Sequence, residues 1–218
     1  MKYYNKDGQE FEFDLEHSYP IGAGKFAIVY GINKDECIKV YQKDCPIDIH
    51  LLEEIKNYHL FHYDALKDIL FTDDGKIGCF LMKKYKRELP DFYIMEVKDF
   101  LREFNTLDRD AKVLSENSIF INDTKTKNTM SYRNRLKMVD YDMYRRSINP
   151  NVANSNRKLL LWLWHDIFCE QRINNGYSNI FKENIIEPFF NPSSGNLDMV
   201  REKLEGKKLV IDGFIRGK

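Results

Sequence analysis

The sequence predicts an α+β protein of two lobes, an antiparallel β-sheet lobe with one helix followed by an α-helical lobe. In the first third, apolar and polar residues alternate in short segments between turn signals. Beyond residue 90, apolar residues instead recur every three or four positions. The 218 residues, 43% of them hydrophobic, suffice for two small lobes with packed cores. We expect the lobes to be residues 1–85 and 86–218, joined by a Lys/Tyr-rich link near Lys84.

Five segments of the first lobe are predicted strands. Each is rich in β-branched or aromatic residues, and the tetrapeptides NKDE and TDDG between them are typical of turns. A helix over residues 47–61 is expected to interrupt this sheet, because it follows Pro46 and spaces apolar residues as a helix does. The predicted strands are EFEFDL, AIVYGI, ECIKVY, DILF and KIGCFLMKKY, which begin at residues 10, 27, 36, 68 and 76.

Helices dominate the second lobe in this prediction. The first is expected over residues 93–114, where the apolar positions follow a helical period. KLLLWLWHDIFCEQRI (158–173) and LDMVREKLEG (197–206) are two further predicted helices. The apolar positions of the first helix are Val97, Leu101, Phe104, Leu107, Ala111 and Leu114.

Charge and cysteine content exclude some classes of function. Lys plus Arg and Asp plus Glu both number 34, so the overall field does not favour nucleic acid as a partner, and none is expected. No apolar run reaches the roughly 18 residues of a membrane span, and the first residues lack an apolar leader segment. The four cysteines are scattered without a CxxC pair, which indicates free thiols in a reducing compartment, the cytoplasm.

A glycine-rich segment, IGAGKFAIVYGI, carries Gly22 and Gly24 ahead of a predicted strand. In a dinucleotide-binding unit such glycines open a helix, and in a P-loop the lysine precedes serine or threonine; here a strand follows and Lys25 precedes Phe26. Two interpretations remain. The segment is either a hairpin whose backbone amides close over phosphates or a plain turn that uses glycine for its dihedral freedom.

A lysine on the next strand favours the phosphate interpretation. Lys39 in ECIKVY shares a strand face with Cys37 and Tyr41. The following helix offers Glu53 and Glu54, either of which is suited to hold the Lys39 ammonium toward an anion. A glycine hairpin, a strand lysine and a helix glutamate thus follow one another in order.

The stretch IFINDTKTKNTMSYRNRLKMVDYDMY places two carboxylates, an amide and a lysine around a short basic insert. Asn128 follows Asp123 by five residues, and Asp140 follows Asn128 by twelve, which leaves room for a hairpin. Lys125 lies two residues after Asp123. These residues supply oxygen ligands for a hard cation together with a cationic side chain.

In this order the elements resemble the protein-kinase-like superfamily, over residues 21–144. The frame matches the H-R-D-x-x-x-x-N loop and the D-F-G aspartate that follows it. The resemblance implies a two-lobed protein-kinase-like fold with a reduced α-helical second lobe. It also implies an enzyme that uses ATP and Mg²⁺. It makes Asp123 and Lys125 catalytic and Asn128 and Asp140 metal ligands. It further implies that the nucleotide is bound by Gly22, Gly24, Val29, Lys39, Glu54 and Met82.

The sequence departs from the family pattern in ways that narrow the resemblance. Ile121 and Asn122 replace histidine and arginine, Asp142 replaces the glycine of D-F-G, and no A-P-E follows. The closest resemblance is to minimal atypical bacterial kinases, including effector-type ones that are translocated. A competing frame on Asn117 puts Lys112 at the base position, where lysine cannot serve, and is rejected.

Three functional hypotheses follow from these residues. The first is an ATP-dependent kinase that phosphorylates protein serine or threonine. The second is a small-molecule kinase of the aminoglycoside or choline type, and the third a catalytically inactive kinase-like binding module. Retention of Lys39, Asp123, Asn128 and Asp140 together favours an enzyme, and the short second lobe favours a protein substrate.

Overall fold

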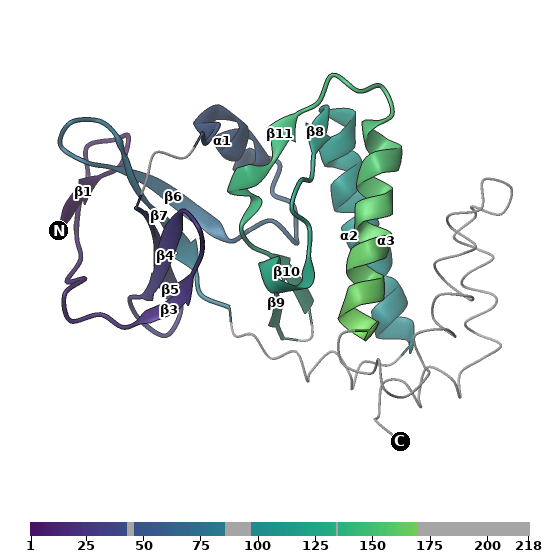
Figure 1. The fold of residues 1–218 in the computed structure, drawn as a ribbon, viewed down its shortest axis with the longest axis horizontal. Coiled ribbons are helices and arrows are strands. Elements are labelled where there is room, and N and C mark those ends of the chain that lie inside the picture. The colour runs from purple at the N-terminus through teal and green to yellow at the C-terminus, as the bar shows by residue number, and fades with distance from the viewer. Residues whose placement is uncertain (43–45, 86–96, 134, 170–218) are drawn as a thin grey trace, which may run out of the picture. The chain divides into compact units, whose positions relative to one another are not determined.

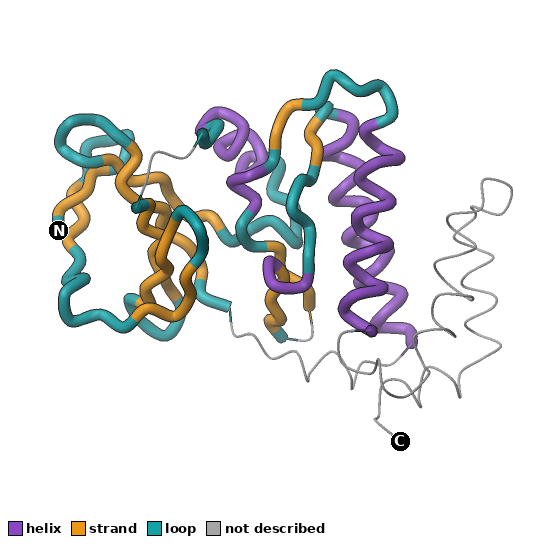
Figure 2. Tube along the Cα trace, in the orientation of Figure 1, coloured by secondary structure: helices purple, strands orange, loops and turns teal. Residues whose placement is uncertain are grey.

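The computed structural model describes residues 1–42, 46–85, 97–133 and 135–169. The chain divides into two compact units, residues 1–86 and 87–218, and each is described by itself. In the described residues the protein is mixed α/β, with a seven-stranded antiparallel sheet and three α-helices (Figure 1). Figure 2 shows the strands concentrated in the first unit and the two long helices in the second.

The first unit is the seven-stranded sheet with one helix inserted between its fifth and sixth strands. The strand order is β2-β1-β6-β7-β5-β4-β3. All five predicted strands are present, and the sequence prediction missed β1 and β3. The elements are β1 (Lys2–Tyr4), β2 (Glu10–Glu12), β3 (Pro20–Ala23), β4 (Ala27–Gly31), β5 (Glu36–Tyr41), α1 (Ile49–Asn57), β6 (Leu66–Phe71) and β7 (Ile77–Lys83).

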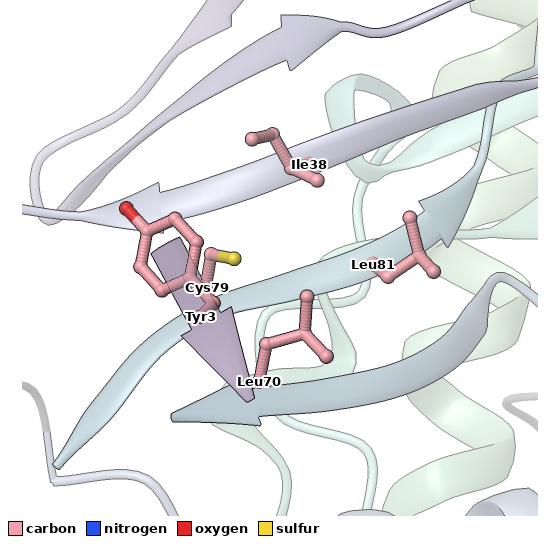
Figure 3. Close-up of a cluster of buried hydrophobic side chains, with 5 residues drawn as sticks. All are labelled: Tyr3, Ile38, Leu70, Cys79 and Leu81. Carbon is pink, nitrogen blue, oxygen red and sulfur yellow. The ribbon is translucent and has the colours of Figure 1, made fainter. Parts of the chain in front are cut away.

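One face of this sheet packs a hydrophobic core, drawn in Figure 3. Ile38 lies opposite Leu81, and Cys79 lies between Val40 on one side and Leu70 on the other. Residues directly opposite one another share a sheet face, so these side chains converge. The buried cluster consists of Tyr3, Ile38, Leu70, Cys79 and Leu81.

The ends of α1 differ from the predicted range of 47–61 for local reasons. The carboxylate of Asp48 accepts a hydrogen bond from Leu51 N–H at 3.0 Å, so the helix begins after this cap. The helix ends at Asn57, and His59 adopts a left-handed φ of 52° that no helix continues through. The apolar residues after Asn57 therefore lie beyond the helix.

The described residues of the second unit form two long helices with short strand pairs between them. α2 and α3 pack against each other, and Figure 1 shows them side by side. The elements are α2 (Val97–Glu116), β8 (Ile119–Phe120), the 3₁₀ turn η2 (Thr126–Asn128), β9 (Thr129–Tyr132), β10 (Arg135–Met138), the 3₁₀ turn η3 (Tyr141–Met143), β11 (Arg145–Arg146) and α3 (Val152–Cys169).

One helix prediction for the second unit requires correction, and parts of two others lie outside the described residues. α3 begins at Val152, six residues before the predicted start, because Asn149 forms a turn in which its side chain accepts from Asn151 N–H at 2.9 Å and its carbonyl from Val152 N–H at 3.1 Å. The start of α2 at Val97 leaves predicted residues 93–96 outside the described residues. The predicted helix over 197–206 also lies outside them.

Two cysteines of the first unit are shielded from solvent. Cys37 and Cys79 are buried free thiols, as predicted for them. Burial raises the pKa of Cys37 to about 11 and that of Cys79 to about 12, so both remain protonated at neutral pH.

Within the described residues, no helix combines the length and apolar composition needed to cross a bilayer.

Gly78 on β7 is required by the packing of Tyr3, and its replacement tests this core. A Cβ at Gly78 would lie 2.4 Å from the Tyr3 ring, closer than side chains approach. We expect Gly78→Ala to lower the free energy of unfolding by about 1–3 kcal/mol, through overpacking. Gly22→Ala is the matched control, because its Cβ would meet only Val29, at 3.8 Å. Equal urea midpoints for the two variants would contradict this packing.

Candidate active site

Three of the predicted nucleotide-binding residues form a row across the sheet of the first unit. Gly22 on β3 lies opposite Val29 on β4, and Val29 lies opposite Lys39 on β5. Opposite residues in antiparallel strands have neighbouring side chains on one face. The row continues to Phe80 on β7, and it occupies the face opposite the core of Figure 3.

Met82 and Lys39 belong to this same face. Met82 lies opposite Cys37, two residues from Lys39 along β5, and strand residues two apart share a face. Lys39 is 8% exposed, and its ammonium lies 5.5 Å from the centre of the Tyr41 ring. The predicted sharing of one face by Cys37, Lys39 and Tyr41 is thus confirmed, although the nucleotide-binding role remains a prediction.

The glycines of the β3–β4 hairpin are not required by the fold. Neither Gly22 nor Gly24 has a positive φ, and a Cβ on Gly24 would meet only the Ala27 carbonyl, at 3.7 Å. The hairpin is closed instead by Gly24 N–H, which donates to that carbonyl at 2.9 Å. The interpretation as a plain turn explains glycine by its dihedral freedom, which this backbone does not use. Gly22 also lies at an irregular register of the β3–β4 pair, so the close approach of a ligand to these glycines stays a prediction.

Alanine variants of these glycines are expected to separate binding from folding. Gly22→Ala and Gly24→Ala should change the free energy of unfolding by no more than about 0.5 kcal/mol, because both sites have room. A methyl group against bound phosphates should cost about 1–3 kcal/mol of binding, or about fivefold to 150-fold in Kd for ATP. Calorimetric titration alongside thermal unfolding measures both. Unchanged ATP affinity in both variants would argue against a phosphate cradle.

The glutamate assigned to Lys39 lies on the middle of α1. Glu54 accepts a hydrogen bond from the Tyr58 hydroxyl one turn later on the chain. Glu53 lies 3.9 Å from the Lys6 ammonium. Both glutamates therefore have other contacts, and the pairing of Lys39 with Glu54 remains a prediction.

In the second unit, two nested strand pairs enclose the other candidate residues. The outer pair joins β8 and β11, with Phe120 opposite Arg145. The inner pair is the β9–β10 hairpin, with Thr129 opposite Met138. The hairpin expected between Asn128 and Asp140 is therefore present, and the candidate residues lie where the inner and outer pairs connect.

Asp123 contacts two other candidate residues in the loop between β8 and β9. Its carboxylate accepts from the Asn128 amide nitrogen at 3.0 Å and pairs with the Lys125 ammonium. The same amide nitrogen donates to the Asp123 carbonyl at 2.9 Å. Asp123 has a left-handed φ of 62°, and such backbone conformations in residues other than glycine concentrate at functional sites. The structure thus brings together three of the four residues predicted here.

The hairpin places Asp140 beside Asn128. Val139 N–H donates to the Asn128 carbonyl at 2.9 Å, so Asp140 follows the residue that is bonded to Asn128. Asp140 also has a left-handed φ, 64°. Both side-chain hydrogen bonds of Asn128 use its nitrogen, which leaves the amide oxygen for another ligand.

An amide oxygen and a carboxylate fit magnesium better than softer metals. Mg²⁺ prefers oxygen ligands and is held by one or two carboxylates together with substrate phosphates and water. In the described residues, no group of three or more His, Cys, Asp or Glu side chains is placed to hold a metal alone. A Mg²⁺ ion at Asn128 and Asp140 would therefore depend on phosphate oxygens for the rest of its coordination.

Asn156 on α3 is a site residue that sequence reasoning missed. It is 1% exposed, and its oxygen accepts from Ile121 N–H at 3.0 Å, two residues before Asp123. Its nitrogen donates to the Ile119 carbonyl at 2.8 Å and the Ser115 hydroxyl at 2.9 Å. Asn156 lies four residues after Val152 and four before Leu160, so an amide on the apolar stripe of α3 was the available signal. This one side chain fixes the start of the loop to both long helices.

The rejected frame on Asn117 falls on the end of a helix. The Asn117 side chain donates to the Val113 carbonyl at 2.9 Å, and Glu116 is exposed beside Lys112. Asp110 is buried within α2, at 3% exposure. The Asn117 side chain thus provides a hydrogen bond to a carbonyl at the end of α2. This structural role accounts for the asparagine at this position without a catalytic role.

Comparisons with known proteins do not assign the chain to a family. No protein-family model and no curated protein sequence matches it. Among solved structures, it is similar to the kinase PK-1 of Cydia pomonella granulovirus, with a TM-score of 0.46 and 20% sequence identity. The match covers 62% of this chain and 57% of the viral kinase chain. A match of this extent assigns no activity, so any functional conclusion depends on the site residues themselves.

Proposed function

We propose that this protein is an ATP-dependent phosphotransferase that transfers the γ-phosphoryl group of ATP to a serine or threonine hydroxyl of a protein. The arrangement at the base of the β9–β10 hairpin carries the proposal. The hairpin holds Asn128 beside Asp140, and the Asn128 amide binds Asp123. Two candidate metal ligands and a candidate base are thereby held by one short segment.

Asp123 is proposed to orient the attacking hydroxyl and to take its proton. The hydroxyl oxygen forms a bond to the γ-phosphorus as the bond from phosphorus to the bridging oxygen breaks, and ADP leaves with those electrons. A carboxylate has about four acceptor sites, so Asp123 can bind a hydroxyl while it holds Asn128 and Lys125. Its side chain is 36% exposed, so a substrate has access to it.

Lys125 and the metal ligands are proposed to balance the phosphate charge. Lys125, which pairs with Asp123, would steady the phosphoryl group between donor and acceptor. Asn128 and Asp140 would hold Mg²⁺, which when bound neutralises phosphate charge. On the first unit, Lys39 and the amides of the glycine hairpin would bind the phosphates of ATP, beside Val29 and Met82.

Radiolabelled ATP distinguishes this function from its two alternatives. The purified chain is incubated with Mg²⁺ and ATP labelled at the γ-phosphate, with a cell lysate divided into protein and small-molecule fractions. Label in protein serine or threonine supports the proposal, whereas label confined to small molecules supports a small-molecule kinase. Binding of ATP without transfer in either fraction would indicate a kinase-like binding module.

A further inference from the structure

A buried carboxylate outside the loop anchors the hairpin that carries the candidate metal ligands. Glu103 on α2 is 0% exposed. One carboxylate oxygen pairs with the Arg135 guanidinium, and the other accepts from Leu136 N–H at 3.0 Å. Arg102 Nε lies 3.9 Å from the oxygen that binds Arg135. Arg135 and Leu136 both lie on β10, so one side chain of α2 engages two successive residues of that strand.

A two-stranded hairpin needs such an anchor to hold its orientation. Among the described strands, β9 and β10 pair only with each other, and an isolated two-stranded hairpin is marginally stable in water. Burial of the Glu103 carboxylate costs free energy, because the charge loses water. Its bonds to two successive residues of β10 offset part of this cost and fix the strand against α2.

The anchored strand leads directly to the candidate metal ligands. Leu136 precedes Asp140 by four residues, and Val139, next to Asp140, bonds to the Asn128 carbonyl at 2.9 Å. A shift of β10 against α2 would therefore move Asn128 and Asp140. Side chains that orient metal ligands without touching the metal typically affect affinity tenfold to a hundredfold.

We infer that Glu103, paired with Arg135, is a positioning residue that fixes the β9–β10 hairpin so that Asn128 and Asp140 bind the metal of the metal–nucleotide complex. The inference rests on the proposed function. It assigns Glu103 no contact with substrate or metal, and its effect passes through Arg135 and Leu136.

The test measures Mn²⁺ affinity, with Mn²⁺ in place of Mg²⁺ because free Mn²⁺ gives an electron paramagnetic resonance signal. The full chain with saturating ADP is titrated with Mn²⁺ as wild type, Glu103→Gln, Arg135→Gln and the double variant. Glu103→Gln keeps an oxygen for Leu136 N–H and removes the charge. Glu116→Gln is the matched control, since Glu116 is exposed on the same helix.

We expect roughly tenfold weaker Mn²⁺ binding in each single variant and no further loss in the double variant, because both changes break one interaction. Affinity for ADP without metal and the Mn²⁺ affinity of Glu116→Gln should match wild type. In transfer assays, excess metal should restore kcat, whereas a purely structural defect would lower the folded fraction and remain at any metal concentration.

Mn²⁺ affinity within about twofold of wild type in folded Glu103→Gln and Arg135→Gln would overturn the inference while leaving the proposed function intact. Should Glu103→Gln fail to fold, Arg135→Gln decides, because the Arg135 side chain is 28% exposed. Absence of Mn²⁺–ADP binding by the wild type would overturn the proposed function, and this inference with it.

Discussion

Replacement of Asp123 by asparagine is expected to reduce phosphoryl transfer by about 10² to 10⁴, which corresponds to roughly 3 to 5 kcal/mol of barrier. An amide has the volume of the carboxylate but cannot take the hydroxyl proton. Asparagine tolerates the left-handed φ of 62° and can accept from the Asn128 amide, so folding and ATP affinity should be nearly unchanged. Steady-state kinetics, thermal unfolding and calorimetric titration of ATP measure the three effects.

Glu116→Gln is the control for this experiment and should leave transfer at the wild-type rate. It lies in the rejected frame and is exposed beside Lys112. Asp110 on the same helix is unsuited as a control because its side chain is buried within α2. Wild-type transfer by Asp123→Asn, or loss of transfer in Glu116→Gln, would mean that the catalytic loop has been placed wrongly.

Replacement of Asp140 by asparagine is expected to remove most of the metal-dependent stabilisation by ATP. At about 100 times its Kd, Mg-ATP should raise the free energy of unfolding of the wild type by roughly 2.7 kcal/mol. Asp140→Asn keeps the left-handed φ of 64° accessible and removes the charge assigned to the metal. Thermal unfolding with ATP, in the presence and absence of Mg²⁺, gives the comparison.

The two aspartate variants should differ in kind. Asp140→Asn should lose the Mg²⁺-dependent part of ATP binding, whereas Asp123→Asn should keep it and lose turnover. Equal loss of metal-dependent binding in both would undo the division of roles between the two carboxylates.

Much of the fold could be predicted because most of its elements have a clear period. The alternation in ECIKVY and the helical period after Val97 identify β5 and α2. β1 and β3 escaped prediction because they are three and four residues long, and β3 contains proline and glycine. The start of α3 was missed because its first turns are rich in asparagine, which is typical of loops.

The candidate site was predictable as a set of residues but not as an arrangement. The spacing of Asn128 and Asp140 predicted a hairpin, whereas the register that sets them side by side depends on turn geometry. The row from Gly22 to Lys39 likewise depends on an irregular register between Pro20 and Gly22. The local sequence pattern does not predict this irregularity. Asn156 and Glu103 act across more than 30 residues of sequence, and only the packed structure reveals their partners.

The most direct measurement of the central claim is a crystal structure of the full chain with Mg²⁺ and a non-hydrolysable ATP analogue. We predict a metal ion about 2.0–2.1 Å from the Asn128 amide oxygen and from an Asp140 carboxylate oxygen, with phosphate oxygens completing its coordination. The Asp123 carboxylate should not contact the metal. A nucleotide bound with its metal on neither Asn128 nor Asp140, or no nucleotide at millimolar Mg-ATP analogue, would contradict the assignment of this protein as a phosphotransferase that works through these residues.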